Sequence, residues 1–330
     1  MPPPSDTKVA IRTLETRNSK PETQGAMEGA TDLLRQVRRI ELRTERLVSS
    51  LAAGRIRSTF KGSGLEFDEV REYAAGDDVR AIDWNVTARA GRPFVKVFRE
   101  ERELTTWLIA DVSGSMRFGA IPGISSRAKL ALAAEAAAVV AVTSLRNRDP
   151  LGLVRVGTGT ALHLPPRRGR GHCLRLIREL IAVPAARGND DAATALETLA
   201  ARPGKRGACF VCSDFLLADD DAAHRLGDAL ARVARRHDVI GLRIADPAES
   251  RLPPGGAPLV VQDPETGAEH VIANGRRARD DYARRWAAAR ERAAARFRAA
   301  GADLVDLSTE HTAFTALRRY FDRRARRVRT

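Results

Sequence analysis

The chain has 330 residues, of which 43% are hydrophobic and 30% are charged, which describes a soluble globular protein with a proper core. Its three cysteines (Cys173, Cys209 and Cys212) cannot all pair, so a disulfide framework is excluded and a reducing compartment is favoured. The first residues lack the pattern of a signal peptide, and no uninterrupted apolar stretch approaches membrane-spanning length. We therefore expect a cytoplasmic protein without membrane insertion.

The formal net charge of +14 raises the question of nucleic-acid binding. Much of the excess lies in two stretches with helical character, residues 276–298 and 318–329. Aromatic residues do not alternate with these arginines, as they would in a surface that stacks single-stranded bases. Solvated arginine faces explain the charge more simply, and nucleic-acid binding stays a less favoured alternative.

The N-terminal part is predicted to hold a tail and an extension ahead of the main domain. Residues 1–27 are rich in Pro, Ser, Thr, Lys and Glu and are expected to be disordered. Apolar residues recur at helical spacing over 31–51, and acids alternate with arginines over 58–96. Because no nucleophile–base pair is visible there, we interpret residues 28–102 as a structural extension, made of a helix and a small β-rich segment.

A short apolar run, residues 107–110, ends in the sequence Asp111-Val-Ser113-Gly-Ser115. The run is typical of a strand buried on both faces, and ligands bind at the carboxyl edge of such strands in open α/β sheets. One carboxylate and two hydroxyls at that edge suit a hard cation such as Mg²⁺. The alternative is an ordinary Ser/Gly turn capped by an aspartate.

Strands and helices alternate through the remainder of the chain. Strands are expected at 152–156, 161–164, 208–212, 239–244 and 304–307, a hairpin insert lies near 255–275, and helices fill the intervals, the first of them beginning at Ser125 or Ser126. This alternation over 103–330 predicts an α/β domain with a doubly wound, mainly parallel sheet. Asp214 follows the strand at 208–212, so it is expected to meet Asp111 at one rim of the sheet.

Several motifs together resemble the bacterial domain of unknown function 58 family, whose members are von Willebrand factor A-like. These motifs are Gly62-x-Gly64-x-Glu66-Phe67, Arg71-x-Tyr73-x-x-Gly76-Asp77-Asp78-x-Arg80-x-Ile82-Asp83-Trp84, Asp111-x-Ser113-x-Ser115-Met116, Ser213-Asp214, Asp246-Pro247-x-Glu249 and Asp263-Pro-Glu-Thr-Gly267. They cover nearly the whole chain from about residue 30 to 320.

The resemblance implies a von Willebrand A fold with a metal-ion-dependent adhesion site (MIDAS). Ser113 and Ser115 would bind Mg²⁺ (or Mn²⁺ or Ca²⁺) directly, and Asp111 and Asp214 would reach it mainly through water. The family's function is largely undetermined. What it implies is a non-enzymatic protein-interaction role beside a MoxR-type AAA+ ATPase, in the assembly or maturation of a client protein complex, with a partner carboxylate completing the metal site.

One position departs from the adhesion-site pattern. The usual Gly-x-Thr loop reads Gly188-Asn189-Asp190-Asp191, so Asp190 stands nearest the threonine position. An added carboxylate either raises the affinity for the cation or reduces the positive charge left to attract a partner. A metal-independent scaffold with a vestigial site is therefore the second interpretation.

Enzymatic readings are weaker. Ser113 stands where haloacid-dehalogenase phosphatases carry a second aspartate, so their general acid/base is missing. Cys209 and Cys212 are three apart on a strand and point to opposite faces, which favours two core cysteines over half a zinc site.

Overall fold

A computed structural model describes residues 10–11, 64–101, 104–119, 128–182, 191–202, 206–217 and 219–327. The chain divides into two compact units, one made of Lys61–Leu104 and the other of Met1–Phe60 with Thr105–Thr330. The predicted disordered tail lies outside the described residues except for the strand β1 (Ala10–Ile11), and the predicted helix at 31–51 lies outside them entirely. The boundaries predicted for the extension, 28–102, stay a prediction.

The larger unit is built on a six-stranded sheet, and the predicted α/β class with a mainly parallel, doubly wound sheet is confirmed. Its strands lie in the order β11-β8-β7-β4-β5-β6, and each neighbouring pair is parallel except β5 and β6. Their bounds are β4 Thr105–Asp111, β5 Leu151–Val156, β6 Leu162–Arg167, β7 Gly207–Ser213, β8 Asp238–Ala245 and β11 Asp303–Ser308.

The strand order places a topological switch point between β4 and β7. From β4 the chain moves to β5 on one side, and it later returns to β7 on the other side of β4. The connections that leave β4 and β7 therefore run in opposite directions, and in open α/β sheets the carboxyl ends of such strands are where ligands bind. Asp111 ends β4, and Asp214 directly follows β7.

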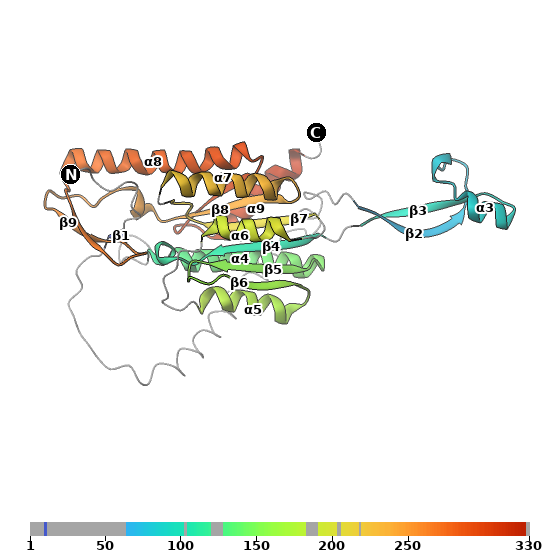
Figure 1. Cartoon of the computed structure of the whole chain (residues 1–330), viewed down its shortest axis with the longest axis horizontal. Helices are drawn as coiled ribbons and strands as arrows, with labels where there is room; N and C mark the ends of the chain where they lie inside the picture. The colour runs from blue at the N-terminus through green and yellow to red at the C-terminus, as the bar shows by residue number, and fades with distance from the viewer. Residues whose placement is uncertain are drawn as a thin grey trace. The chain divides into compact units, whose positions relative to one another are not determined.

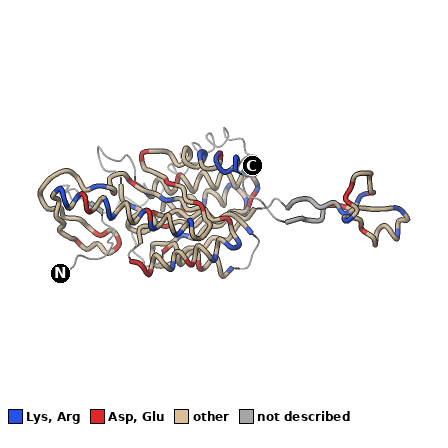
Figure 2. The backbone as a smooth tube through the Cα atoms, turned by 90° about the horizontal axis from the view of Figure 1, so that it is seen from above, with Lys and Arg blue, Asp and Glu red and all other residues tan. Residues whose placement is uncertain are grey.

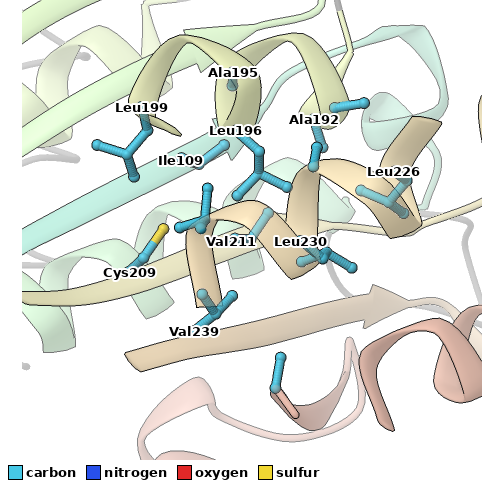
Figure 3. Packing of buried hydrophobic residues seen from close by; sticks show 14 of the residues in the cluster. Ile109, Ala192, Ala195, Leu196, Leu199, Cys209, Val211, Leu226, Leu230 and Val239 are labelled. Carbon is cyan, nitrogen blue, oxygen red and sulfur yellow. The ribbon is translucent and has the colours of Figure 1, made fainter. Parts of the chain in front are cut away.

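Helices cover both faces of this sheet (Figure 1). Their bounds are α4 Lys129–Asn147, α5 Arg170–Ile181, α6 Ala192–Ala201, α7 Asp220–Ala234, α8 Arg276–Ala299 and α9 Ala313–Arg327. Helices α6, α7 and α8 pack on one face, whereas α4 contacts α5 and α9 on the other. In the core of the first face, Leu196 of α6 and Leu230 of α7 lie over Val211 (Figure 3). Cys209 belongs to the same core, and Cys212 is also fully buried, as predicted.

Helix α4 differs from its prediction at its first turn. It begins at Lys129 after the extended cap residue Ala128, which pairs with Gly119, and Ser125 and Ser126 lie outside the described residues. The Lys129 amide donates to Phe118 O (2.9 Å), which joins the start of the helix to the end of the Asp111 loop. Among the described residues α4 is the one helix long and apolar enough to cross a membrane, but 72% of that window is buried in the protein. Such burial also suits the core helix of a soluble domain.

A second, small sheet pairs β1 with the hairpin of β9 (Leu259–Gln262) and β10 (Glu269–Ile272). The turn of this hairpin is the Asp263-Pro-Glu-Thr-Gly267 sequence, and Asp263 holds it by accepting from the Glu265 amide (2.9 Å) and from the Thr266 hydroxyl (2.7 Å). The turn therefore has a defined shape that can present one side chain.

The smaller unit contains an antiparallel pair, β2 (Gly64–Glu72) and β3 (Phe94–Glu101), and two short helical segments. The Arg71 guanidinium forms two hydrogen bonds with the Asp77 carboxylate (2.7 and 2.6 Å), within the stretch where acids and arginines alternate in the sequence. The helical segments are η1 (Val79–Ala81) and α3 (Trp84–Ala90). The sequence-based interpretation missed α3, although Asp83 caps its first turn and Gly91 closes it in the left-handed region.

Candidate metal site at the sheet edge

Asp111 anchors the candidate site, and its carboxylate is held from two directions. Its Oδ1 accepts from the amide of Ser113 (2.9 Å), and its Oδ2 accepts from the hydroxyl of Ser213 (2.7 Å). The first bond shapes the loop that follows β4, and the second joins that loop to the end of β7. The carboxylate is therefore fixed in orientation across the switch point.

The two loop serines place their hydroxyls side by side. Ser113 Oγ and Ser115 Oγ are 3.2 Å apart, and both residues are buried. Neighbouring oxygens around an octahedral Mg²⁺ lie about 3 Å apart, since each Mg–O bond is about 2.1 Å long. The two hydroxyls thus fit adjacent vertices of one coordination shell.

Gly157, just after β5, lets the chain approach this loop closely. A Cβ at Gly157 would lie 2.3 Å from the Ser113 nitrogen, and the residue has φ +100°. Only glycine allows both this approach and this backbone conformation. The neighbouring strand therefore also determines where Ser113 lies.

Asp214 reaches the same edge of the sheet but is bonded to a buried lysine. Its Oδ1 accepts from the Leu216 amide (3.0 Å), and its Oδ2 accepts from Lys129 Nζ (2.9 Å). Lys129 also donates to Glu249 Oε1 (2.5 Å), and its side chain is 0% exposed. In the structure, Asp214, which the sequence assigned to a metal site, is therefore paired with the ammonium of Lys129.

Burial and charge act in opposite directions on this cluster. Burial disfavours the charged form of Lys129, but the carboxylates of Asp214 and Glu249 outweigh it and raise the pKa of the ammonium above its ordinary value. Burial raises the pKa of the Glu249 carboxyl above its ordinary value, the Lys129 ammonium opposes that shift, and the negative charge of Asp214 adds to it. Lys129 is thus positively charged over the whole physiological range.

Glu249 is positioned by the short turn η3 (Pro247–Ser250). Its Oε2 accepts from the Asp246 amide (3.0 Å), and Asp246 Oδ1 accepts from the Ala248 amide (2.9 Å), which is a complete capping box. Tyr282 of α8 donates to Glu249 O (2.9 Å). The Asp246-Pro247-x-Glu249 motif therefore delivers a carboxylate to Lys129, a role that the sequence alone did not indicate.

The β9–β10 turn lies directly on the Asp111 loop. Glu265 accepts from the amides of Gly114 (3.0 Å) and Ser115 (2.9 Å), which begin the 3-10 turn η2 (Gly114–Arg117). A Cβ at Gly114 would lie 2.1 Å from Pro264 O, so the contact requires glycine. The sequence-based interpretation missed this role of Glu265, although it did note the turn motif.

The candidate oxygens are buried in this arrangement. Asp111 is 6% exposed, Ser113 6%, Ser115 3% and Asp214 4%. The sequence suggested that they gather over an open rim of the sheet. The structure gathers the loops of β4 and β7 at that rim but leaves little of these side chains exposed.

The loop expected to supply a further ligand is described only in part. Asp190 lies outside the described residues. Its neighbour Asp191 caps α6 by accepting from the Thr194 amide (2.9 Å) and hydroxyl (3.0 Å), and it pairs with Arg225 (2.6 Å). Thr194 is thus part of a helix cap rather than of the serine pair.

No group of three or more His, Cys, Asp or Glu side chains suited to a metal occurs within the described ranges. A cation at the Asp111 loop would accordingly depend on the serine hydroxyls and on water for most of its coordination shell.

Burial raises the pKa of the Cys212 thiol to about 12, so this residue stays a neutral thiol in the core.

Residues 69–292 match the model of a family described as protein of unknown function DUF58. Uncharacterized protein Rv1480 of Mycobacterium tuberculosis is 33% identical over 276 residues, which cover 83% of this chain and 84% of that protein. An uncharacterized protein of Mycobacterium avium is 32% identical over 167 residues, which cover 49% of this chain and 94% of that protein.

Two solved structures also align with this chain. The conserved hypothetical protein BatB from Bacteroides thetaiotaomicron aligns with TM-score 0.40 and 14% identity over 68% of this chain and 99% of that one. The SpRpn10 VWA domain aligns with TM-score 0.36 and 12% identity over 66% and 95%. Both TM-scores lie below 0.5, so the architecture of this chain rests on its own strand order.

Proposed function

Because this chain belongs to the DUF58 family, we propose that it is a non-enzymatic protein-interaction module whose Asp111 loop binds a divalent cation such as Mg²⁺. Ser113 and Ser115 would hold the cation directly, while Asp111 and Asp214 act through water. The cation supplies a positive charge that attracts a carboxylate. Asp190 is proposed as a further ligand from its position in the sequence.

The geometry of the serine pair carries this proposal. Two hydroxyls lie 3.2 Å apart at the end of a buried strand, beside a carboxylate that two hydrogen bonds hold in place. In the structure the two hydroxyls form a hydrogen bond with each other, and a bound cation would replace that bond without moving them far. The topological switch point also supports the proposal, since it is where ligands bind in open α/β sheets.

A protein-interaction role agrees with the polar groups of the site. The ionisable side chains there form ion pairs with one another, as Lys129 does with Asp214 and Glu249, or hydrogen bonds with the main chain, as Asp111 does with the Ser113 amide. A catalytic base, by contrast, has to face the proton that it removes. This pairing supports a binding site rather than a reaction centre.

We further propose that the module works in the cytoplasm with a MoxR-type AAA+ ATPase and a client protein complex that is being assembled or matured. The basis is the family resemblance of the motifs, not a contact of this chain. A test is whether the purified chain changes the ATPase rate of such a partner in the presence of Mg²⁺. A Ser113→Ala, Ser115→Ala variant would then lose the effect.

A metal-independent scaffold is the second candidate, and Lys129 favours it. The ammonium already neutralises Asp214, and the β9–β10 turn already covers Gly114 and Ser115. In that case the site would be an internal polar joint, with no cation and no partner carboxylate.

Nucleic-acid binding is less well supported. Acidic residues occur among the Lys and Arg residues over much of the described backbone (Figure 2). On α8 the basic side chains of Arg284, Arg290 and Arg298 pair with Asp281, Asp306 and Glu291. A steep, salt-dependent shift of duplex DNA would be needed to favour this function.

Isothermal titration distinguishes the first two candidates. Mg²⁺ titrated into the wild type should give a one-site binding heat, and the Ser113→Ala, Ser115→Ala variant should give none. Absence of heat with both proteins, at ionic strength held constant, would favour the scaffold. Glu269→Ala on the same hairpin serves as a control, because Glu269 is exposed in β10.

A further inference from the structure

Lys129 is the most completely buried charged side chain near the site, and its position is coupled to the serine loop. The Phe118 amide donates to Ser115 O (3.2 Å), and the Lys129 amide donates to Phe118 O (2.9 Å). Two main-chain hydrogen bonds therefore connect Ser115 to the first residue of α4. The lysine side chain, with 0% exposure, extends from this point to Asp214.

Three ionisable groups in so little solvent must satisfy one another. Lys129 Nζ lies 2.9 Å from Asp214 Oδ2 and 2.5 Å from Glu249 Oε1, and the two carboxylates are 2% and 6% exposed. Removing one member of such a cluster leaves an uncompensated buried charge. The ammonium therefore supplies the positive charge that these two carboxylates require.

The same positive charge opposes a second cation nearby. Lys129 donates to Asp214, and Asp214 directly follows Ser213, whose hydroxyl donates to Asp111 Oδ2 (2.7 Å), so two hydrogen bonds and one peptide link connect the ammonium to the carboxylate of the serine loop. A divalent cation at Ser113 and Ser115 is attracted by Asp111 and Asp214 and repelled by the Lys129 ammonium. In a partly desolvated site these opposing interactions are stronger than in water.

We propose that Lys129 is an affinity-determining residue, a covalently attached cation that neutralises Asp214 and keeps divalent-cation binding at the Asp111 loop weak and reversible. This inference rests on the proposed function. The site with Lys129 would hold a cation only when the cation is abundant or when a partner adds a carboxylate. The site without it would be a tight structural metal site.

Lys129→Met tests the proposal, since methionine keeps most of the length and volume of the side chain but removes the charge. Mg²⁺ is titrated calorimetrically, and thermal unfolding is recorded with and without Mg²⁺ at constant ionic strength. We expect the variant to melt lower than the wild type without Mg²⁺. We also expect it to bind Mg²⁺ at least tenfold more tightly and to gain more in Tm when Mg²⁺ is added.

A double variant protects the test against misfolding. Lys129→Met combined with Glu249→Gln removes one charge of each sign, and it is compared with Glu249→Gln alone. The double variant should again bind Mg²⁺ at least tenfold more tightly than its reference. Lys96→Met, which removes an exposed lysine paired with Asp83 in the smaller unit, should leave the affinity unchanged.

The outcomes separate this inference from the proposed function. If wild type binds Mg²⁺ through the serines but neither lysine variant binds it more tightly, Lys129 does not determine affinity and only this inference is overturned. If Ser113→Ala and Ser115→Ala leave the Mg²⁺ response of Lys129→Met intact, the cation occupies the place of the ammonium between Asp214 and Glu249 and this inference is overturned, whereas the proposed function is decided by the same serine substitutions in the wild type. Binding that appears only once Lys129 is removed supports the inference and contradicts cation binding by the natural protein.

Discussion

Glu265→Ala should loosen the loop that carries the candidate serines. Glu265 accepts from the amides of Gly114 and Ser115 at 3.0 and 2.9 Å, and its side chain is half-buried. A hydrogen bond to a charged group contributes about 1.5–3 kcal/mol, and solvent screening of a half-buried carboxylate reduces that value. We therefore expect the two bonds together to contribute about 2–3 kcal/mol to the free energy of unfolding.

For a unit of this size, a loss of that magnitude lowers Tm by roughly 4–10 °C. Calorimetry measures the change in Tm, and amide hydrogen exchange at Gly114 and Ser115 locates it. The two amides should exchange faster in Glu265→Ala, while Glu265→Gln, which keeps one neutral acceptor, should fall between the two proteins. Glu269→Ala, at an exposed position of β10, is the matched control and should leave both observables unchanged.

Unchanged exchange at Gly114 and Ser115 in Glu265→Ala would refute this reasoning. It would mean that water replaces the carboxylate without cost, and that the β9–β10 turn does not hold the loop. A lower Tm with unchanged exchange would place the destabilisation in the hairpin itself.

Three further perturbations test other parts of the structure. Burial lowers the pKa of His237 to about 4, and the neighbouring positive charge of Arg236 adds to this shift. Between pH 6.5 and 4 the imidazole of the unfolded chain therefore binds a proton that the folded chain does not bind. Stability should consequently fall by up to about 3 kcal/mol as the pH drops through that window, and denaturant unfolding of His237→Gln should lack this component. Gly157→Ala should lower the free energy of unfolding by about 2 kcal/mol or more beyond the loss in the control Gly169→Ala. Both glycines have positive φ (+100° and +106°), but only a Cβ at 157 meets Ser113. Equal losses in denaturant unfolding would argue against the close approach of Gly157 to the loop. Trp84→Ser should change stability by no more than about 0.5 kcal/mol because Trp84 is 69% exposed. A large change in denaturation would show a packing role that this exposure does not suggest.

The larger unit could be predicted from the sequence because its buried strands and its helices have distinct apolar patterns. The run before Asp111 and the run at 208–212 became β4 and β7, and their ends indicated the edge at which a site would form. Local signals predicted poorly where a tertiary contact decided the boundary. The start of α4 at Lys129 is set by a bond to Phe118 O, which no local pattern reveals.

The polar contacts of the site were harder to predict than its position. Lys129 meets Glu249 across 120 residues of sequence, and Glu265 meets Ser115 across 150. Such pairings depend on how the connections from the sheet fold back over its edge. The motifs Asp246-Pro247-x-Glu249 and Asp263-Pro-Glu-Thr-Gly267 could be recognised in the sequence, but the residues that they contact in the fold could not. In α3, the cap at Asp83 and the glycine at 91 were readable signals that were overlooked among the charged residues.

The most direct measurement is anomalous diffraction from crystals of this chain soaked in Mn²⁺. The proposed function predicts one anomalous peak at bonding distance, about 2.1 Å, from both Ser113 Oγ and Ser115 Oγ, and its loss in the Ser113→Ala, Ser115→Ala variant. A well-ordered loop with no peak beside it, or a peak remote from both hydroxyls, would contradict cation binding by the Asp111 loop.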